Sequence, residues 1–392
     1  MTFKKKLVAI ALVSSFSIAH ASEPGKLSLW INADKGYAGI QKVGDEFTKK
    51  TGVPVVVEHP EDAPGKFQQA AAAGKGPDIW CWPHDRAGEW IAAGLLDPVT
   101  PSKKFQDQIT PLAWKAFTMD GKIWAYPISI EAIGLVYNKD LIPKPPKTME
   151  EIPALDKRLK AKGDSAILWE YENTYFTWPL LAANGGYAFK QRPDGTYDGS
   201  DTGVNNAGAI KGAELLAKFV KEGILPEDTS GADAEAGMNS GKVAMWITGP
   251  WSWDNLKRSK INFGVAPIPS VAGKPAAPFI GVLGCMINHS SVNKDVAVEF
   301  LENNLLTLPG LEAMNAATPL GVPANKAYYD KLKNDPNIRA TMESAKAGQL
   351  MPNNPEMGRF WAAMAPALAN VGNGRQTPKE ALDNAAKRIT SK

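Results

Sequence analysis

The chain has 392 residues, which is more than one ordinary domain contains, so its length favours two domains. Its 44 lysines and arginines nearly balance its 41 aspartates and glutamates, and no basic tract carries interleaved aromatic residues. This composition argues against nucleic acid as a partner.

Residues 1–21 have the pattern of a secretory signal peptide. Lysines occupy positions 4–6, the run 7–18 is apolar, and Ala19-His20-Ala21 has the form of a cleavage site. We therefore expect a mature protein that begins near Ser22 and acts in the periplasm. No later apolar run approaches the roughly 18 residues of a membrane span, and an interior lipobox cysteine is absent, so we expect no lipid anchor.

The first part of the mature chain alternates between strand and helix patterns. Strands are predicted at 26–31, 53–58 and 79–82, with a helix between each pair. The first helix has apolar residues at helical spacing and ends at Gly52, and the second covers 66–73. Three strand–helix units in a row predict a parallel sheet with right-handed crossovers.

A strand-to-helix junction follows the third strand. The apolar run 79–82 is typical of a buried strand, and helical spacing over 87–96 begins after Asp85, which we expect to cap that helix. Ligands of open α/β sheets bind at such carboxyl ends of strands. The Trp82 indole beside the Asp85 carboxylate and the Arg86 guanidinium suits a neutral, hydroxyl-rich ring such as a sugar. The alternative is a core tryptophan beside a solvated ion pair.

Two long apolar runs are placed to connect two domains. The first, 122–137, contains the carboxylate Glu131, and the second is 279–287. A chain that leaves one lobe and later returns to it needs two such extended crossings. The remaining patterns predict a second α/β unit with strands at 166–171 and 243–248 and helices at 149–162 and 209–222, a helix after 174–179 that ends at 185–186, and a helix opened by 249–253. They also predict a helical tail, with helices at 296–306, 337–347, 358–370 and 379–389.

The chain has two cysteines, Cys81 and Cys285, each in an apolar run that predicts a strand. A secreted chain of this size does not need disulfides for its core, so buried free thiols are the expected state. A bridge is the alternative in an oxidising compartment, and it requires the two Cα atoms to lie close together.

Motifs along almost the whole mature chain carry a family resemblance. They are the segments 30–37, 76–79, 125–128, 137–141, 175–179, 249–253 and 279–283, together with Trp82 and the run His84-Asp85-Arg86. These motifs resemble the maltose/maltodextrin-binding proteins of ABC importers. The resemblance implies an α/β fold of the two-lobed periplasmic-binding-protein type (type II), with a ligand cleft between the lobes. It also implies a first lobe at 22–130 and 284–332, a second at 131–283 and 333–392, and hinge crossings near 128–133, 280–283 and 331–336.

The same resemblance implies a set of sugar-contacting positions. Those on the first lobe or hinge are Asn32, Asp34, Lys35, Trp82, Asp85, Arg86 and Glu131, and those on the second are Tyr175, Trp251, Met351 and Trp361. The aromatic rings would stack on glucose faces while the charged groups take hydroxyls. Each position also has a structural alternative, such as a charge pair at a helix start for Asp34–Lys35 or a core position for the tryptophans. No cofactor and no metal are implied.

The chain departs from the family pattern in three places. Asn173-Thr174 stands where the family has Glu-Pro, Ala365 where it has an arginine, and Pro64-Gly65 where it has paired glutamates. The Asn173 amide can still hydrogen-bond a hydroxyl but without charge assistance, and Glu172 and Arg359 are the candidates to compensate. We expect a protein that favours maltotriose or longer chains over maltose, or that accepts another α-linked glucoside.

Two other functional classes fit the sequence less well than binding. A secreted glycoside hydrolase needs two carboxylates about 5–10 Å apart, for which Glu131 with Asp85 or Glu172 could serve, but the chain has no acid/base signature, metal cluster or nucleophile elbow. A receptor for amino acids or peptides would need fixed charges rather than four aromatic platforms. We expect a monomeric binder that is not an enzyme, with permease subunits of an importer as partners and a chemoreceptor as a further candidate.

Overall fold

The parallel sheet predicted from the first strand–helix units is present. The computed structural model describes residues 22–391, so the predicted signal peptide lies outside the described residues. Strand β1 (Leu27–Trp30) pairs in parallel with β2 (Val55–Glu58) and β3 (Ile79–Pro83). Helices α1 (Tyr37–Thr51) and α2 (Ala63–Ala72) are the crossovers, and α1 ends at Gly52, whose φ of 78° suits glycine.

Strands from distant parts of the chain complete this first sheet. Its order is β15-β7-β14-β3-β1-β2, where β7 (Tyr126–Ala132) and β14 (Phe279–Asn288) are antiparallel neighbours and β15 is Val322–Pro323. Two short strands also pair with β14, namely β4 (Leu96–Asp97) and β16 (Gln349–Leu350). The other elements of this lobe are α3 (Ala87–Ala92), α4 (Lys103–Gln108), α5 (Pro111–Ala116), β5 (Thr118–Met119), β6 (Lys122–Ile123), α11 (Lys294–Phe300), α12 (Leu308–Ala317) and α13 (Lys326–Leu332).

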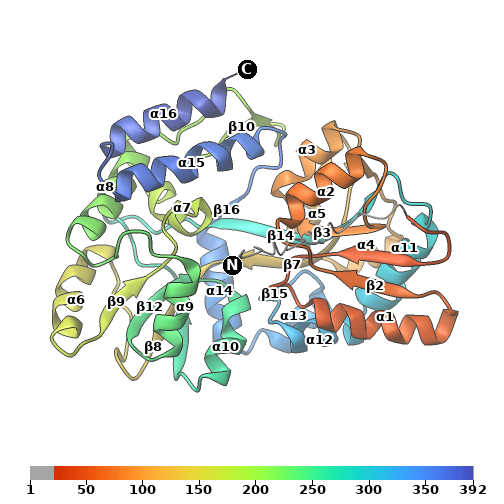
Figure 1. Ribbon diagram of the computed structural model, residues 1–392, viewed down its shortest axis with the longest axis horizontal. Coiled ribbons are helices and arrows are strands. Elements are labelled where there is room, and N and C mark those ends of the chain that lie inside the picture. The colour runs from red at the N-terminus through yellow and green to blue at the C-terminus, as the bar shows by residue number, and fades with distance from the viewer. Residues whose placement is uncertain (1–21, 392) are drawn as a thin grey trace, which may run out of the picture.

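A second sheet forms the centre of the other lobe. Its order is β13-β8-β12-β9, with strands at Phe263–Ala266, Gly134–Asn138, Val243–Thr248 and Ser165–Leu168. The other elements of this lobe are α6 (Ile152–Lys160), α7 (Thr174–Ala182), β10 (Lys190–Gln191), β11 (Tyr197–Asp198), α8 (Ala207–Lys221), α9 (Gly231–Asn239), α10 (Trp253–Arg258), α14 (Pro336–Ala347), α15 (Met357–Gly372) and α16 (Pro378–Thr390). Figure 1 shows the two lobes side by side, with α14 between them.

The lobes are joined by buried strands, as the two apolar runs predicted. Every residue of β7 and of β14 is buried, and the two strands lie side by side in the middle of the molecule (Figure 1). Only Ile133 separates β7, in the first sheet, from β8, in the second. The predicted two-lobed α/β fold is thereby confirmed. The boundaries 22–130 with 284–332 and 131–283 with 333–392 remain our proposal for where the lobes divide.

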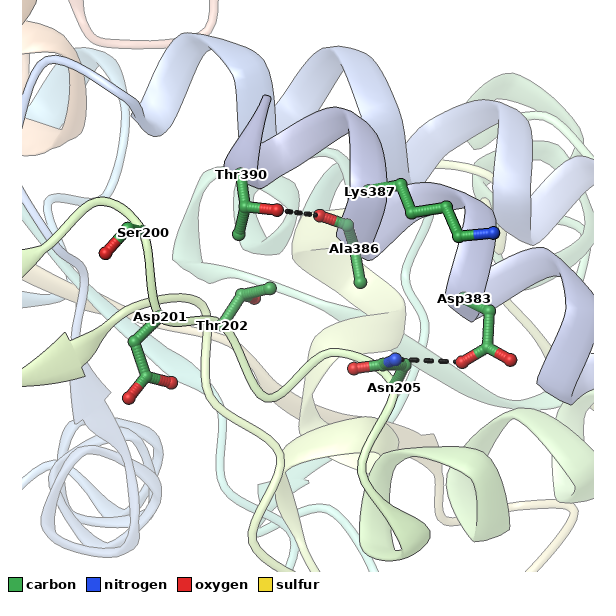
Figure 2. Close-up of a pocket in the computed structure, with 8 residues that line it drawn as sticks. All are labelled: Ser200, Asp201, Thr202, Asn205, Asp383, Ala386, Lys387 and Thr390. Carbon is green, nitrogen blue, oxygen red and sulfur yellow. Dashed lines mark hydrogen bonds between the residues drawn. The ribbon is translucent and has the colours of Figure 1, made fainter. Parts of the chain in front are cut away.

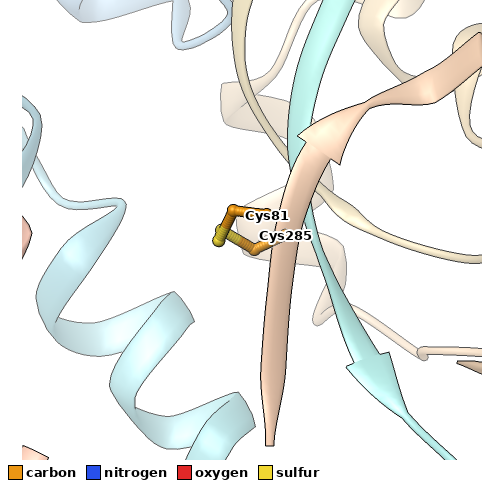
Figure 3. Close-up of a disulfide and its surroundings, with 2 residues drawn as sticks. All are labelled: Cys81 and Cys285. Atoms are coloured by element: carbon orange, nitrogen blue, oxygen red, sulfur yellow. A yellow bond between two sulfur atoms is a disulfide. The ribbon is translucent and has the colours of Figure 1, made fainter. Parts of the chain in front are cut away.

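The expectation of free thiols is wrong. Cys81 of β3 and Cys285 of β14 form a disulfide, with their Cα atoms 4.0 Å apart (Figure 3). The antiparallel register places the two residues directly opposite each other, and both are fully buried. This pairing depends on the return of β14 alongside β3, about which the local sequence around each cysteine carries no information.

The junction after β3 also differs from the prediction. A 3₁₀ turn over His84–Arg86 precedes α3, so Asp85 lies inside that turn and does not cap the helix. Helix α3 ends at Ala92, before the predicted 96, because Gly94 adopts a φ of 69° and the chain enters β4. Within residues 22–391 no helix is both long and apolar enough to cross a membrane.

Candidate functional site

The loop between β1 and α1 places three predicted residues against the hinge. The Asn32 amide donates to the Asp34 carboxylate at 2.6 Å, and Lys35 Nζ lies 2.8 Å from Glu131 Oε1 at the end of β7. Burial disfavours the charge on Lys35, but the Glu131 and Asp34 carboxylates outweigh it together and raise the pKa of the lysine. The ammonium group therefore stays charged between the two acids.

Trp251 brings the second lobe to the same place. It lies in a 3₁₀ turn over Pro250–Ser252, and the centroid of its ring is 4.1 Å from Lys35 Nζ. The ring of Tyr175 is 6.5 Å from that of Trp251, centroid to centroid. Burial raises the pKa of Tyr175 well above its ordinary value, and the nearby Glu131 and Asp85 carboxylates raise it further. Tyr175 is thus a neutral phenol beside the acids of the first lobe.

A direct hydrogen bond connects the lobes at Asp85. Trp361 of α15 donates from Nε1 to Asp85 Oδ2 at 2.9 Å. Burial raises the pKa of Asp85 to about 6, although the Trp361 hydrogen bond and the Arg86 charge act in the opposite direction. The two positions, both implied by the family resemblance and 276 residues apart in the sequence, are therefore in contact.

Trp82 forms the outer layer of an aromatic stack. Its ring is parallel to that of buried Trp80, with centroids 5.3 Å apart, and Trp80 stacks in turn on Phe67 at 4.8 Å. Trp80 and Phe67 are fully buried, whereas Trp82 is partly exposed. A ring fixed in this way can present a flat face without losing side-chain entropy on binding.

Some candidate residues are engaged elsewhere. The Arg86 guanidinium hydrogen-bonds Glu89 and Gln68 of its own lobe. Asn173 is exposed and caps α7, its Oδ1 accepting from the Tyr175 N–H at 3.2 Å, so this amide performs the structural role of an N-cap. Its neighbour Glu172 is partly buried.

Arg359 does not compensate for Ala365 in this structure. Its guanidinium lies 3.7 Å from Glu356 and donates to the Ser391 carbonyl near the end of the chain.

His84 is a site residue that the sequence patterns did not identify. Its Nδ1 accepts from the Val282 N–H of β14 at 3.1 Å, which leaves Nε2 to donate to the Met351 carbonyl at 2.9 Å. Burial lowers the pKa of His84 to about 4, so the ring is neutral. Met351 itself is buried and packs over Gly281 of the hinge strand. In the sequence, His84 stands out only as part of the family run His84-Asp85-Arg86.

One cavity of about 360 Å³ within residues 22–391 adjoins the predicted site, and another of the same volume does not. The first lies between the lobes and is lined by Asp34 and Trp251, among others. The other lies between the loop 200–205 and α16, where Asn205 bonds Asp383 (Figure 2), and no predicted site residue lines it.

Two α/β lobes joined by buried crossing strands, with acids and indoles meeting between them, define a type II solute-binding protein. The chain belongs to the bacterial extracellular solute-binding protein family, whose model matches residues 32–307. It is 33% identical to a galactooligosaccharide-binding protein of Bacillus subtilis, over 97% of this chain and 92% of the relative.

Two further relatives also match over most of their length. Identity is 31% to a maltodextrin-binding protein of Bacillus subtilis (96% of this chain, 93% of the relative). It is 28% to a maltooligosaccharide ABC transporter solute-binding lipoprotein of Streptococcus pneumoniae (93% and 88%). The chain is accordingly a binding protein and not an enzyme.

Proposed function

We propose that this protein binds a neutral oligosaccharide between its lobes and delivers it to the membrane permease of an ABC importer. Two contacts between the lobes carry the proposal. The Lys35–Glu131 pair lies against the ring of Trp251, and Trp361 donates a hydrogen bond to Asp85. Such groups provide charged donors and acceptors for hydroxyls and flat faces for sugar rings. The names of the three relatives support the same ligand class.

Within that class we propose a maltodextrin of three or more glucose units as the ligand. The contacting set is the one inferred from sequence, with Asn32, Asp34, Lys35, Trp82, Asp85, Arg86, Glu131, Glu172, Asn173, Tyr175, Trp251, Met351 and Trp361. Asn173 already uses its carbonyl oxygen to cap α7, and Ala365 has no hydrogen-bonding side chain. A short ligand held by few groups loses most from such missing contacts, each costing about 1.5–3 kcal/mol.

A galactooligosaccharide is the second candidate, because the relative at 33% identity is named for that ligand. The two sugars present the same kinds of hydroxyls and ring faces and differ in linkage and in the orientation of single hydroxyls. Which of the two sugars binds therefore depends on how the aromatic rings of the site are spaced.

The cellular setting is also part of the proposal. We propose a periplasmic monomer that is exported by the signal peptide 1–21 and docks on permease subunits, with a chemoreceptor as a further candidate partner.

Isothermal titration calorimetry with maltose, maltotriose, maltotetraose, trehalose and β-1,4-galactooligosaccharides tests the ligand class and its finer identity together. We expect saturable binding that strengthens from maltose to maltotriose. Stronger binding of the galactosides would replace the maltodextrin assignment, and no heat with any oligosaccharide would overturn the proposed function.

A further inference from the structure

The cavity beside Trp251 has walls from both lobes. Asp34 and Thr318 line it from the first lobe, and Glu170, Phe176 and Glu235 line it from the second. Its volume of about 360 Å³ lies at the lower end of the roughly 300–1,000 Å³ range of small-molecule sites. A space of this size suits one sugar ring better than a whole oligosaccharide.

The cavity is continuous with the contacts already described. Trp251 and Asp34 line it, and the same two residues adjoin Lys35, through its cation–π contact with the indole at 4.1 Å and the carboxylate 3.7 Å from Nζ. Trp251 and Asp34 therefore border both Lys35 and this space. A chain of sugars that lies against Lys35 and continues past the indole enters the cavity.

The chemistry of the walls favours a neutral, hydroxyl-rich unit. Carboxylates outnumber cations, because Asp34, Glu170 and Glu235 line the space and the lining Arg258 is paired with Asp254. An excess of carboxylates accepts hydrogen bonds from hydroxyls and repels anions.

Apolar and unpaired polar groups complete the walls. The rings of Phe176 and Trp251 lie 6.4 Å apart at 60° and provide apolar surface. Thr248, which is 2% exposed, also lines the cavity, and its hydroxyl has no hydrogen-bond partner among residues 22–391.

We propose that this cavity is an additional subsite, which takes one further neutral hexose unit of the bound oligosaccharide beyond Trp251. The proposal rests on the proposed function, since it concerns the same ligand, and it makes this region a determinant of preferred chain length. The subsite is formed jointly by the two lobes, so a longer ligand also makes more contacts that depend on both.

Ala317 offers a way to block the subsite without touching the Lys35–Glu131 pair. It is the last residue of α12 and lines the cavity, so Ala317→Phe should fill part of the space. Its neighbour Ala316 is exposed and does not line the cavity, which makes Ala316→Phe the matched control. Calorimetry would measure the affinity of wild type and both variants for glucose- and galactose-based chains of two to five units, with thermal unfolding as a check on folding.

In the wild type, the unit that occupies the cavity should strengthen binding about three- to tenfold, as expected for one additional aromatic contact. Ala317→Phe should abolish that gain and leave the shorter chains unchanged, whereas Ala316→Phe should keep it. If Ala317→Phe fails to fold, Thr318→Val, which removes a lining hydroxyl at nearly constant size, should reduce the same gain.

Several outcomes would overturn the subsite. The first is that the affinity of the wild type does not depend on the length of the oligosaccharide. The second is that Ala317→Phe keeps the gain in affinity with length, and the third is that Ala317→Phe weakens binding of the shortest and longest chains equally. In each of these cases the wild type still binds sugar, so the proposed function survives. A wild type that binds no oligosaccharide overturns both proposals.

Discussion

His84 and Asp85 are adjacent and buried, and burial shifts the pKa values of their side chains in opposite directions. The pKa of the Asp85 carboxyl is raised to about 6 by burial, and the pKa of the His84 imidazole is lowered to about 4 by the same cause. Burial favours the neutral form of each group, which is the protonated acid and the unprotonated base. Between about pH 4 and 6.5, Asp85 therefore titrates mainly in the folded state and His84 mainly in the unfolded state.

The two shifts have opposite effects on stability as pH changes. The folded state holds the Asp85 proton more tightly than the unfolded chain, so the Asp85 contribution to the free energy of unfolding is lost as pH rises through about 6. The unfolded chain holds the His84 proton more tightly, so the His84 contribution is lost as pH falls from about 6.5 to about 4. Each effect is on the order of 3 kcal/mol, and the two largely cancel in the wild type.

We predict that single substitutions remove this cancellation. Relative to wild type, Asp85→Asn should lose stability as pH falls from 6.5 to 4, and His84→Gln should gain it. Urea unfolding at pH 4, 5, 6 and 7 measures the differences. Variant curves that run parallel to the wild-type curve would show that neither group is shifted.

His84 should also affect ligand binding through Met351. A glutamine at this position can keep a donor for the Met351 carbonyl, whereas an asparagine can keep an acceptor for the Val282 N–H and leaves the carbonyl unpaired. We predict that His84→Asn weakens oligosaccharide binding about five- to tenfold and that His84→Gln restores most of it, consistent with about 1 kcal/mol for one hydrogen bond. His289→Asn at an exposed histidine is the control.

The expected difference in oligosaccharide affinity between the two His84 variants distinguishes a positioning role from general destabilisation. If both His84 variants lose the same affinity at pH 7 while their stability differs, the Met351 contact does not position the site.

At the level of elements, the disulfide joins the strand that leads to the site with the strand that crosses the hinge. It closes a loop across a sequence separation of 204 residues. In the chain-entropy model so long a loop corresponds to roughly 5 kcal/mol, at the upper end of the range observed. We predict that Cys81→Ala with Cys285→Ala lowers the free energy of unfolding by about 2–5 kcal/mol and leaves oligosaccharide affinity within about twofold. Equal stability of the variant and the oxidised wild type would contradict this role.

Local sequence patterns predicted the helices and strands better than they predicted which elements lie against one another. The apolar spacing of α1 and its stop at Gly52 are properties of neighbouring residues, and the structure confirms both. The Cys81–Cys285 pairing depends on register between strands about 200 residues apart, which no local pattern contains. Aspartate is a residue type that often caps helices, but the contact of Asp85 with Trp361 and its place in a 3₁₀ turn are set by tertiary packing.

The sequence likewise predicted some residues of the candidate site better than others. The family resemblance implied Lys35, Glu131 and Trp251, which the structure brings together. His84 was missed because its role consists of two backbone contacts, and the helix-capping role of Asn173 could not be separated from ligand binding by residue type alone.

At the level of the whole molecule, ligand binding should be coupled to closure of the lobes. A ligand that contacts both lobes shifts their equilibrium only by its difference in affinity for the closed and open arrangements. Trp361 reaches across from α15 to Asp85 and thus belongs to the set that can create such a difference. We predict that saturating oligosaccharide reduces the radius of gyration measured by small-angle scattering, and that an unchanged radius at saturation would exclude closure on binding.

Removing the indole that crosses between the lobes should weaken both closure and affinity. We predict that Trp361→Ala reduces oligosaccharide affinity by about 2 kcal/mol or more, roughly 30-fold, as for a desolvated aromatic anchor. Its ligand-free stability should fall by less than the ~3–5 kcal/mol of a core tryptophan, because the ring is only partly buried. Trp114→Ala is the control, since that partly buried indole bonds the Gln106 carbonyl within the first lobe. A Trp361→Ala protein that unfolds easily yet binds with wild-type affinity while folded would identify Trp361 as a core residue.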